Sequence, residues 1–321
     1  MKIWVKYYLL LILLSGCARL PAPRISGISG ISSAHITRTV LLPHVSSGSS
    51  LSRDGQMLYL VSDDAPYVYT YSLKTGETDS VLLPYLDSKA HRMSHPQKAD
   101  YEASFITEDK GEKYLILFGS GSRSPTRDFV GIFPLDKSKI PERRDAAALY
   151  KHLRISGNLA LKDFNLEGAT RTSDGTILLL NRGRQQYFQV SENDLWAWIE
   201  NGTLPAVSVQ STPLPGAAPY TFSGAETLDK TTLVFAASQE ATKSAQSDGE
   251  VVGSAIGFLH KTNDNTWQVK GFWPVKDASG KPAREKIEGV IPNPAAQNFR
   301  KFIALTDNDD GQSKLLWIEL R

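Results

Sequence analysis

The sequence predicts an all-β fold, a five-bladed β-propeller, with six blades as the alternative count. A hairpin pattern recurs five times along the chain, at intervals of about sixty residues. Each copy precedes further runs that alternate in polarity or are rich in β-branched and aromatic residues, with Gly, Pro, Asn and Asp between them. A run near the N-terminus resembles the fourth strand that the last copy lacks. Closing a ring in this way leaves few exposed sheet edges.

The N-terminal residues 1–16 resemble a bacterial lipoprotein signal peptide. Lys2 and Lys6 flank the start of a short apolar stretch, which ends in the tetrad LSGC. Cys17 closes this tetrad and is the only cysteine of the chain, so we expect it to be lipidated rather than disulfide-bonded. An ordinary secretory signal with an incidental cysteine is the alternative. Ala18, rather than Asp, follows the cysteine, which resembles lipoproteins delivered to the outer membrane.

The segment after the signal is rich in Pro, Gly and Ser, and residues 17–34 are expected to form the lipidated cysteine and a flexible tether. Removing the signal also removes Lys2 and Lys6, which brings the formal charge of +2 close to zero. A near-neutral chain lacks the basic surface that nucleic-acid binding requires. We therefore expect no nucleic-acid partner and a single propeller domain over residues 35–321.

The five hairpin copies share a Glu or Ser at the start of the first strand and a polar or charged stretch after the second. They span residues 46–64, 100–122, 165–184, 223–240 and 286–310. The third strand of the fifth copy is the last run of the sequence, so we expect residues 35–45 to complete that blade.

Two connections between third and fourth strands are predicted to hold short helices, in blades two and three. Residues 143–153 supply the first. Residues 191–202 supply the second, with Ser191 or Asn193 as the N-cap, an apolar face, and Gly202 as the stop.

Both open ends of each hairpin are expected to lie at one mouth of the central channel, because the first strand runs away from that mouth and the second returns to it. This places a set of charged residues around the mouth. The set comprises Glu102, Glu167, Arg182, Arg184, Glu226, Glu240 and Glu288, with Ser47 in place of a glutamate in the first copy.

Several glutamates around a narrow axis cannot all remain ionised without a counter-charge. The sequence leaves three readings of them open: fasteners between blades that accept backbone hydrogen bonds, calcium ligands, or catalytic carboxylates. Calcium takes six to eight oxygen ligands, and the tentative candidates for it are Asp63, Asp64, Asp307 and Asp309.

Other motifs are weaker. His91 and His95 have metal-ligand spacing only on a helix, and their Pro-flanked context favours loop histidines. No G-x-S-x-G elbow is present, which argues against an α/β-hydrolase, and the glycine-rich GSGSRSPTR lacks a Walker lysine. The polar insert 240–254 is either a loop or a lid over the mouth.

The elements DYEA, NLEGA, GAET and IEGV, with SDD and NRGR after the next strand, resemble a group of exported bacterial propellers. The group includes the esterase-like phytase domain and the SdiA-regulated propeller family. The resemblance implies a propeller, in some members calcium, and in some members phosphoester or ester hydrolysis. Those propellers often have six blades, and Ser47 departs from their glutamate.

Taken together, these features predict a lipid-anchored propeller of the bacterial cell envelope, at the outer membrane and facing the periplasm. We expect a monomer that touches the membrane through its lipid alone and binds a polar small molecule or an envelope protein at the mouth. The alternative is a metal-dependent, calcium-using hydrolase of phosphoesters, esters or lactones. A purely structural envelope component is a third reading.

Overall fold

The structure is a computed structural model that describes residues 30–87, 92–216, 220–241, 249–296, 298–308 and 311–321. The predicted signal peptide, Cys17 and most of the predicted tether lie outside the described residues, as do His91, Asp309 and residues 242–248 of the 240–254 insert. No helix within the described residues is long and apolar enough to cross a membrane.

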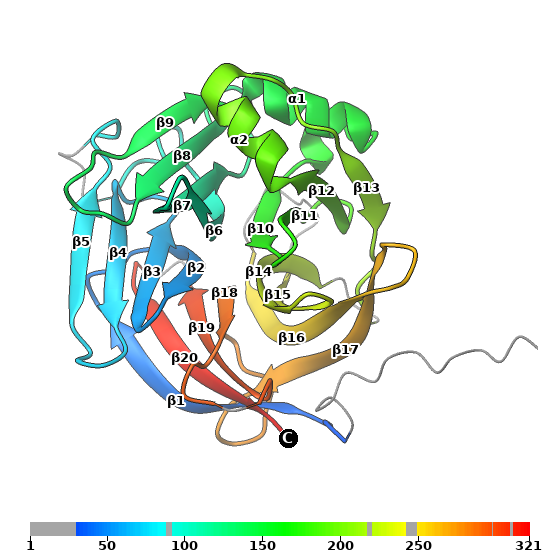
Figure 1. The fold of residues 1–321 in the computed structure, drawn as a ribbon. Helices are drawn as coiled ribbons and strands as arrows, with labels where there is room; N and C mark the ends of the chain where they lie inside the picture. Colours follow the sequence, from blue (N-terminus) through cyan, green and yellow to red (C-terminus); the bar gives the residue numbers. More distant parts are fainter. Residues whose placement is uncertain (1–29, 88–91, 217–219, 242–248, 297, 309–310) are drawn as a thin grey trace, which may run out of the picture.

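The described residues form an all-β propeller, with sheets arranged around a central axis (Figure 1). Three sheets have four antiparallel strands in chain order, and the first strand of each lies nearest the axis. The first sheet contains β2 (Gly48–Asp54), β3 (Met57–Ser62), β4 (Tyr67–Ser72) and β5 (Thr78–Leu82). The second contains β6 (Tyr101–Asp109), β7 (Glu112–Gly119), β8 (Phe129–Pro134) and β9 (Glu142–Asp145). The third contains β10 (Leu166–Arg171), β11 (Thr176–Asn181), β12 (Gln186–Ser191) and β13 (Ser208–Ser211).

The other eight strands form one sheet in the order β14-β15-β16-β17-β1-β20-β19-β18. It consists of two four-stranded runs, joined where β17 and β1 pair in parallel at Ala34–Val275 and His35–Lys276. The first run contains β14 (Thr221–Asp229), β15 (Thr232–Glu240), β16 (Val251–Lys261) and β17 (Trp267–Lys276). The second contains β18 (Ile287–Pro292), β19 (Lys301–Asp307), β20 (Ser313–Leu320) and β1 (Ala34–Leu42).

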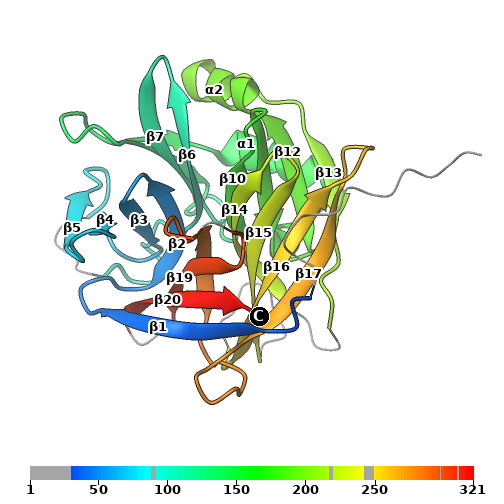
Figure 2. The same ribbon diagram turned by 60° about the horizontal axis from the view of Figure 1, so that its bottom comes forward.

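The N-terminal strand β1 runs antiparallel to β20, in the position predicted for residues 35–45 (Figure 2). Ala34 pairs with Leu320, and Leu42 pairs with Ser313. Because successive strands alternate in direction, β20 starts at the face where the inner strand β18 starts. The strand β1 therefore begins at the opposite face of the ring.

The two predicted helices are present as α1 (Ala147–Ser156) and α2 (Glu192–Asn201). The first begins at Ala147 rather than at residue 143, because the preceding residues form the edge strand β9 against β8. At α2 the Ser191 hydroxyl accepts a hydrogen bond from a backbone N–H of the first turn, at 3.0 Å. Gly202 ends this helix in a left-handed conformation, with φ of 79°. A single 3₁₀ turn, η1 (Leu161–Asp163), precedes β10.

The second strand of each sheet is a continuous apolar run, because neighbouring sheets cover both of its faces. Strands β3, β7, β11 and β19 are buried over at least four consecutive positions. The outer strands β5, β9 and β13 are polar and mostly exposed, with the sequences TDSVL, ERRD and SVQS. Polar edge strands disfavour pairing with other chains.

The inner strands β2, β6, β10, β14 and β18 each carry a shift of register near their start. The residue after the shift is small in every case: Ser50, Ala103, Gly168, Gly224 and Gly289. A Cβ atom on Gly289 would lie 2.6 Å from the Cβ of Leu51 in β2. Small residues therefore allow the inner strands to pack side by side around the axis.

This close approach predicts that Gly289→Ala lowers the free energy of unfolding by about 1–3 kcal/mol, the usual cost of overpacking a core. Gly253→Ala in β16 is the matched control, because its Cβ would lie 3.6 Å from the nearest atom, the Ala283 carbonyl oxygen. Urea unfolding of both variants measures the difference. Equal stability of the two would contradict the packing argument.

Candidate functional site in the central cavity

The register shift leaves one residue unpaired in each inner strand, and these residues occupy equivalent positions around the ring. They are Ser49, Glu102, Glu167, Ser223 and Glu288. A β-bulge redirects its extra side chain relative to the alternating pattern of the strand. All of them except Ser223 line one cavity, at the end of the axis where the inner strands begin. Three of the predicted glutamates thus meet in one site.

The two serines of this set connect neighbouring sheets. The Ser49 hydroxyl donates a hydrogen bond to the carbonyl of Tyr101 in β6, and the Ser223 hydroxyl donates to the carbonyl of Ile287 in β18, at 2.6 Å. Each acceptor carbonyl directly precedes the bulged glutamate of the next inner strand. Fastening between sheets is therefore a property of the serines, whereas the glutamates have side-chain partners or face the cavity.

Glu226 does not share this position, contrary to the alignment of GAET with the other copies. It lies further along β14 than the bulged Ser223, and it does not line the cavity. Burial raises the pKa of Glu226 to about 7, although a hydrogen bond from the Thr227 N–H and the charge of Arg53 oppose this shift. Ser47 likewise precedes the bulge rather than occupying it, yet it does line the cavity.

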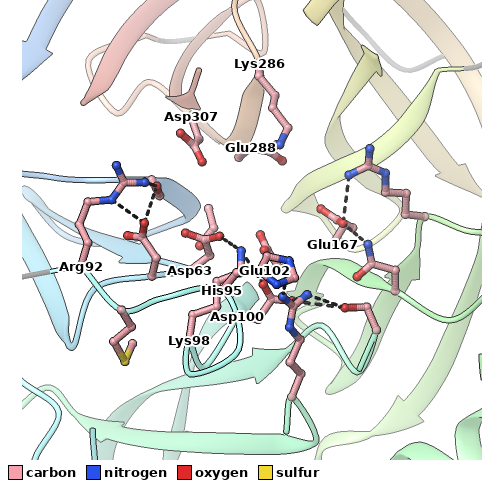
Figure 3. A pocket seen from close by; sticks show the side chains of 18 residues that line it. Asp63, Arg92, His95, Lys98, Asp100, Glu102, Glu167, Lys286, Glu288 and Asp307 are labelled. Carbon is pink, nitrogen blue, oxygen red and sulfur yellow. Dashed lines mark hydrogen bonds and ion pairs between the residues drawn. The ribbon is translucent and has the colours of Figure 1, made fainter. Parts of the chain in front are cut away.

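The cavity has a volume of about 230 Å³ and is lined by eighteen residues, of which Met93 is the one apolar member (Figure 3). Its walls come from three sources: the beginnings of the inner strands, the ends of the second strands, and the connection between β5 and β6. The ends of the second strands bring Asp63, Arg182 and Asp307 against the bulged glutamates. Both open ends of four hairpins therefore face one site, whereas no described residue of the β14–β15 hairpin lines it.

The connection between β5 and β6 contributes Arg92, Met93, His95 and Lys98 to the cavity. The Met93 N–H donates to the Asp64 carbonyl at 2.7 Å, which holds this segment against the first sheet. His95 is a loop histidine, as predicted, but it lines the cavity, and its Nε2 lies 3.2 Å from Arg127 Nη2. Burial and then the charges of Arg127 and Lys98 lower the pKa of His95, so the ring is neutral at neutral pH.

Sequence reasoning missed five charged residues of the cavity wall: Arg92, Lys98, Asp100, Arg127 and Lys286. The first three come from the connection between β5 and β6. The available signal was the group of basic residues in HRMSHPQKAD, directly before the DYEA element. Because this connection has no counterpart in the repeat, comparing the copies with one another could not reveal it.

Lys98 lies at the centre of a first group of ion pairs. Its ammonium contacts Asp63 and lies 2.8 Å from Asp100 Oδ1, while Arg127 Nη1 lies 2.6 Å from Asp100 Oδ2. Burial opposes the charge of Lys98, but the neighbouring carboxylates outweigh it and raise its pKa well above the ordinary range. For Asp63, burial together with Asp100 and Asp64 raises the pKa to about 7, against the opposing effect of Lys98.

Arg182 and Lys286 form a second group with three glutamates. Arg182 lies 3.3 Å from Glu167 Oε1 and 2.7 Å from Glu240 Oε1. Lys286 Nζ lies 3.1 Å from Glu288 Oε1 and 3.8 Å from Glu240 Oε1. All five side chains are at least nine-tenths buried. Two cations therefore hold three carboxylates away from water, and Glu240 takes part although it comes from beyond the cavity wall.

Glu102 differs from the other carboxylates of the wall. It has no hydrogen bond or ion pair with any described residue, and its side chain is only partly buried because it faces the cavity (Figure 3). Burial, followed by the charges of Asp100, Glu167 and Asp63, raises the pKa of Glu102 well above its ordinary value, and Lys98 only partly offsets this. Burial and the neighbouring negative charges therefore disfavour the ionised form of the Glu102 carboxyl group, and a cation beside it would favour that form.

The predicted calcium ligands come together only in part. Asp63, Asp64 and Asp307 line the cavity, whereas Asp309 lies outside the described residues. Asp64 already accepts hydrogen bonds from Ser46 and Ser47 and pairs with Arg92 Nε at 2.7 Å.

A different acidic group, Asp63, Asp100 and Glu102, has one oxygen of each carboxylate within 4.8 Å of the others. These are the ligand atoms that calcium prefers, but the Lys98 ammonium contacts two of the three carboxylates. A calcium ion in this group would have to share the space with a lysine.

Arg184, predicted at the mouth with Arg182, does not reach the cavity. Its side chain is 57% exposed and pairs with Asp163 at 3.0 Å. The two arginines flank Gly183, whose Cα faces the Asp163 carbonyl so closely that an added Cβ would lie 2.2 Å from that oxygen. This tight turn directs the two side chains to different surroundings.

Residues 44–320 match the family described as "Family of unknown function (DUF6929)". The chain belongs to this family. No curated protein matches the sequence. The resemblance to the phytase and SdiA-regulated propellers therefore stays a prediction.

Solved structures similar to this DUF6929 chain include several different proteins. The allergen Mala s 1 of Malassezia sympodialis is 11% identical, with a TM-score of 0.51 over 88% of this chain and 96% of that one. The glutaminyl cyclase of Myxococcus xanthus is 9% identical, with a TM-score of 0.49 over 90% and 97%. The WD40 repeats of RRP9 are 9% identical, with a TM-score of 0.46 over 91% and 100%. At such identities the likeness concerns the fold alone.

The buried pairing of Arg182 predicts that Arg182→Met destabilises the protein by about 3–5 kcal/mol at pH 7, because it leaves Glu167 and Glu240 short of a counter-charge. The loss of unfolding free energy caused by Arg182→Met should become smaller as the pH falls, because a protonated carboxyl group needs no cation. Arg184→Met is the matched control and should change the free energy of unfolding by less than about 1 kcal/mol. Chemical denaturation at pH 7 and pH 5 measures both, and equal losses would contradict this view of the cavity.

Proposed function

We propose that this propeller binds a small polar ligand in the central cavity. The observation that carries the proposal is a set of acceptor atoms without partners among the described residues. Two of them are buried, Oδ1 of Asp63 and Oε2 of Glu288, and the partly buried Glu102 carboxyl group also faces the cavity without a hydrogen-bond partner among these residues. Buried polar atoms in folded proteins nearly always have a hydrogen-bond partner. A ligand that donates hydrogen bonds would provide it.

The size of the cavity favours a small molecule over a protein segment as the occupant. Ligand cavities commonly measure about 300–1,000 Å³, and this one, at about 230 Å³, lies just below that range. Its nearly all-polar wall also disfavours an apolar side chain or lipid tail, because burying polar groups without hydrogen bonds is costly. The occupant proposed is therefore compact and rich in hydrogen-bond donors.

We further propose that the ring has five blades. Three sheets have four strands each. The eight-stranded sheet divides into two further runs of four strands, which are linked by only two residue pairs between β17 and β1. The five equivalent bulges agree with this count. In this reading the N-terminal strand β1 completes the fifth blade.

For its location, we propose a monomer anchored in the cell envelope by a lipid on Cys17, at the outer membrane and facing the periplasm. The support is the signal-like residues 1–16 and the LSGC tetrad. The direction of β1 is compatible with this, because the chain preceding Ala34 joins the ring at the face opposite the cavity.

Ligand binding is tested with the detergent-solubilised full chain and a panel of small polar amines, polyols, amino acids and phosphates. We expect at least one compound to raise the melting temperature of the wild type and of Glu226→Gln, which alters a glutamate outside the cavity. The same compound should raise that of Glu102→Gln much less. A ligand at a hundred times its Kd stabilises by about 2.7 kcal/mol. A panel without any shift, or shifts that Glu102→Gln retains in full, would argue against the proposal.

The second candidate is a metal-dependent hydrolase, favoured by the acidic group of Asp63, Asp100 and Glu102. If the protein is a binding module whose carboxylates are neutralised by Lys98, EDTA should leave the melting temperature of the purified chain unchanged. Differential scanning calorimetry with and without EDTA measures this. A lowered melting temperature that calcium restores, but sodium does not, would favour the hydrolase and justify a phosphoester screen.

A further inference from the structure

The wall of the cavity contains more acidic than basic side chains. Seven carboxylates line it, against five side chains that are Lys or Arg. Glu240, just behind the wall, adds another carboxylate to the Arg182 and Lys286 group. Because His95 is neutral, it does not correct the imbalance. The site as a whole therefore favours an occupant of positive charge.

Every basic side chain of the wall already has a carboxylate partner. Arg92 pairs with Asp64, Lys98 with Asp63 and Asp100, Arg127 with Asp100, and Arg182 and Lys286 with the buried glutamates. A phosphate that displaced one of these carboxylates would leave it without a counter-charge, although Nε of Arg127 and of Arg182 has no acceptor among the described residues. Breaking a buried ion pair in this way is strongly unfavourable.

The acceptors without partners lie on two sides of the cavity. Glu102 stands beside Asp63, whose Oδ1 is buried and unpartnered. Glu288 is 3% exposed, and its Oε2 has no partner among the described residues, while its Oε1 pairs with Lys286. Glu288 is thus a deeply buried side chain with an acceptor left over, which points to a donor supplied from outside the chain.

We propose that the ligand is a small organic cation whose ammonium or guanidinium group pairs with the Glu102 carboxylate, while a second donor group reaches Glu288. This inference rests on the proposed function, since it names the chemical class of the ligand bound in the same cavity. Charge-assisted hydrogen bonds between nitrogen cations and carboxylates are about twice as strong as neutral ones. Glu102 and Glu288 would then gain the partners they lack.

A metal ion fits these observations less well. Lys98 contacts two of the three carboxylates of the acidic group, so a divalent ion there would face a fixed positive charge. A cavity of about 230 Å³ also exceeds what one ion fills, since a water molecule occupies about 30 Å³. An organic cation fills the space and bonds at hydrogen-bond distance, which does not require Lys98 to move.

Binding of a cation should also release a proton. Among the groups that face Glu102, the charges of Asp100, Glu167 and Asp63 add to burial and raise its pKa, while Lys98 lowers it. A cation beside Glu102 favours the ionised form and so lowers its pKa. A neutral ligand brings no charge beside Glu102, so we expect it to shift this pKa little and to release no proton.

Three four-carbon probes of matched length test the charge of the ligand: 1,4-diaminobutane, 1,4-butanediol and succinate. Each is added to the full chain at pH 7, and the melting temperature and the heat of binding are measured. We expect the diamine alone to raise the melting temperature. Calorimetry in two buffers of different ionisation enthalpy should show proton release on binding.

The variant Glu102→Gln should weaken diamine binding at least tenfold and abolish the proton release, whereas Glu226→Gln should retain both. Binding of the diol or succinate but not the diamine would overturn the inferred charge and leave the proposed binding function standing. Diamine binding that Glu102→Gln does not weaken would overturn the role of Glu102. If no probe binds the wild type, the inferred cation is wrong, and the wider panel decides the binding function separately.

Discussion

Charge buried around a narrow axis has to be neutralised, and this constraint shapes the whole centre of the molecule. The bulged glutamates are held in place by the inner strands, which small residues bring close together. On one side of the cavity the glutamates form ion pairs with Arg182 and Lys286. On the other side Asp100 forms ion pairs with Lys98 and Arg127. The connection between β5 and β6 supplies part of this counter-charge, since Arg92 and Lys98 line the cavity.

Much of the fold could be predicted from repetition, since strand patterns and turn residues are local properties. The five hairpins, the pairing of residues 35–45 with the last sheet and the two helices all followed from such patterns. The boundary of α1 did not, because Glu142–Asp145 were drawn into a sheet edge by tertiary pairing.

The site was only partly predictable. The cavity brings together four residues as expected: Glu102, Glu167, Glu288 and Arg182. The GAET element resembles the other copies in sequence, but the bulged residue of its strand is Ser223 and not Glu226. A shift of register has no signature in a four-residue motif. Lys98 and Asp100 lie in a connection unique to one blade, so no repeat pointed to them.

The direction of β1 has a consequence for how the cavity meets its surroundings. This strand enters the ring at Ala34, at the face away from the cavity, and reaches the cavity side only near Leu42. An attachment through the residues before Ala34 would therefore lie at the face opposite the cavity. Such an attachment would leave the mouth free, so a solute arriving by diffusion would reach the carboxylates of the cavity without passing it.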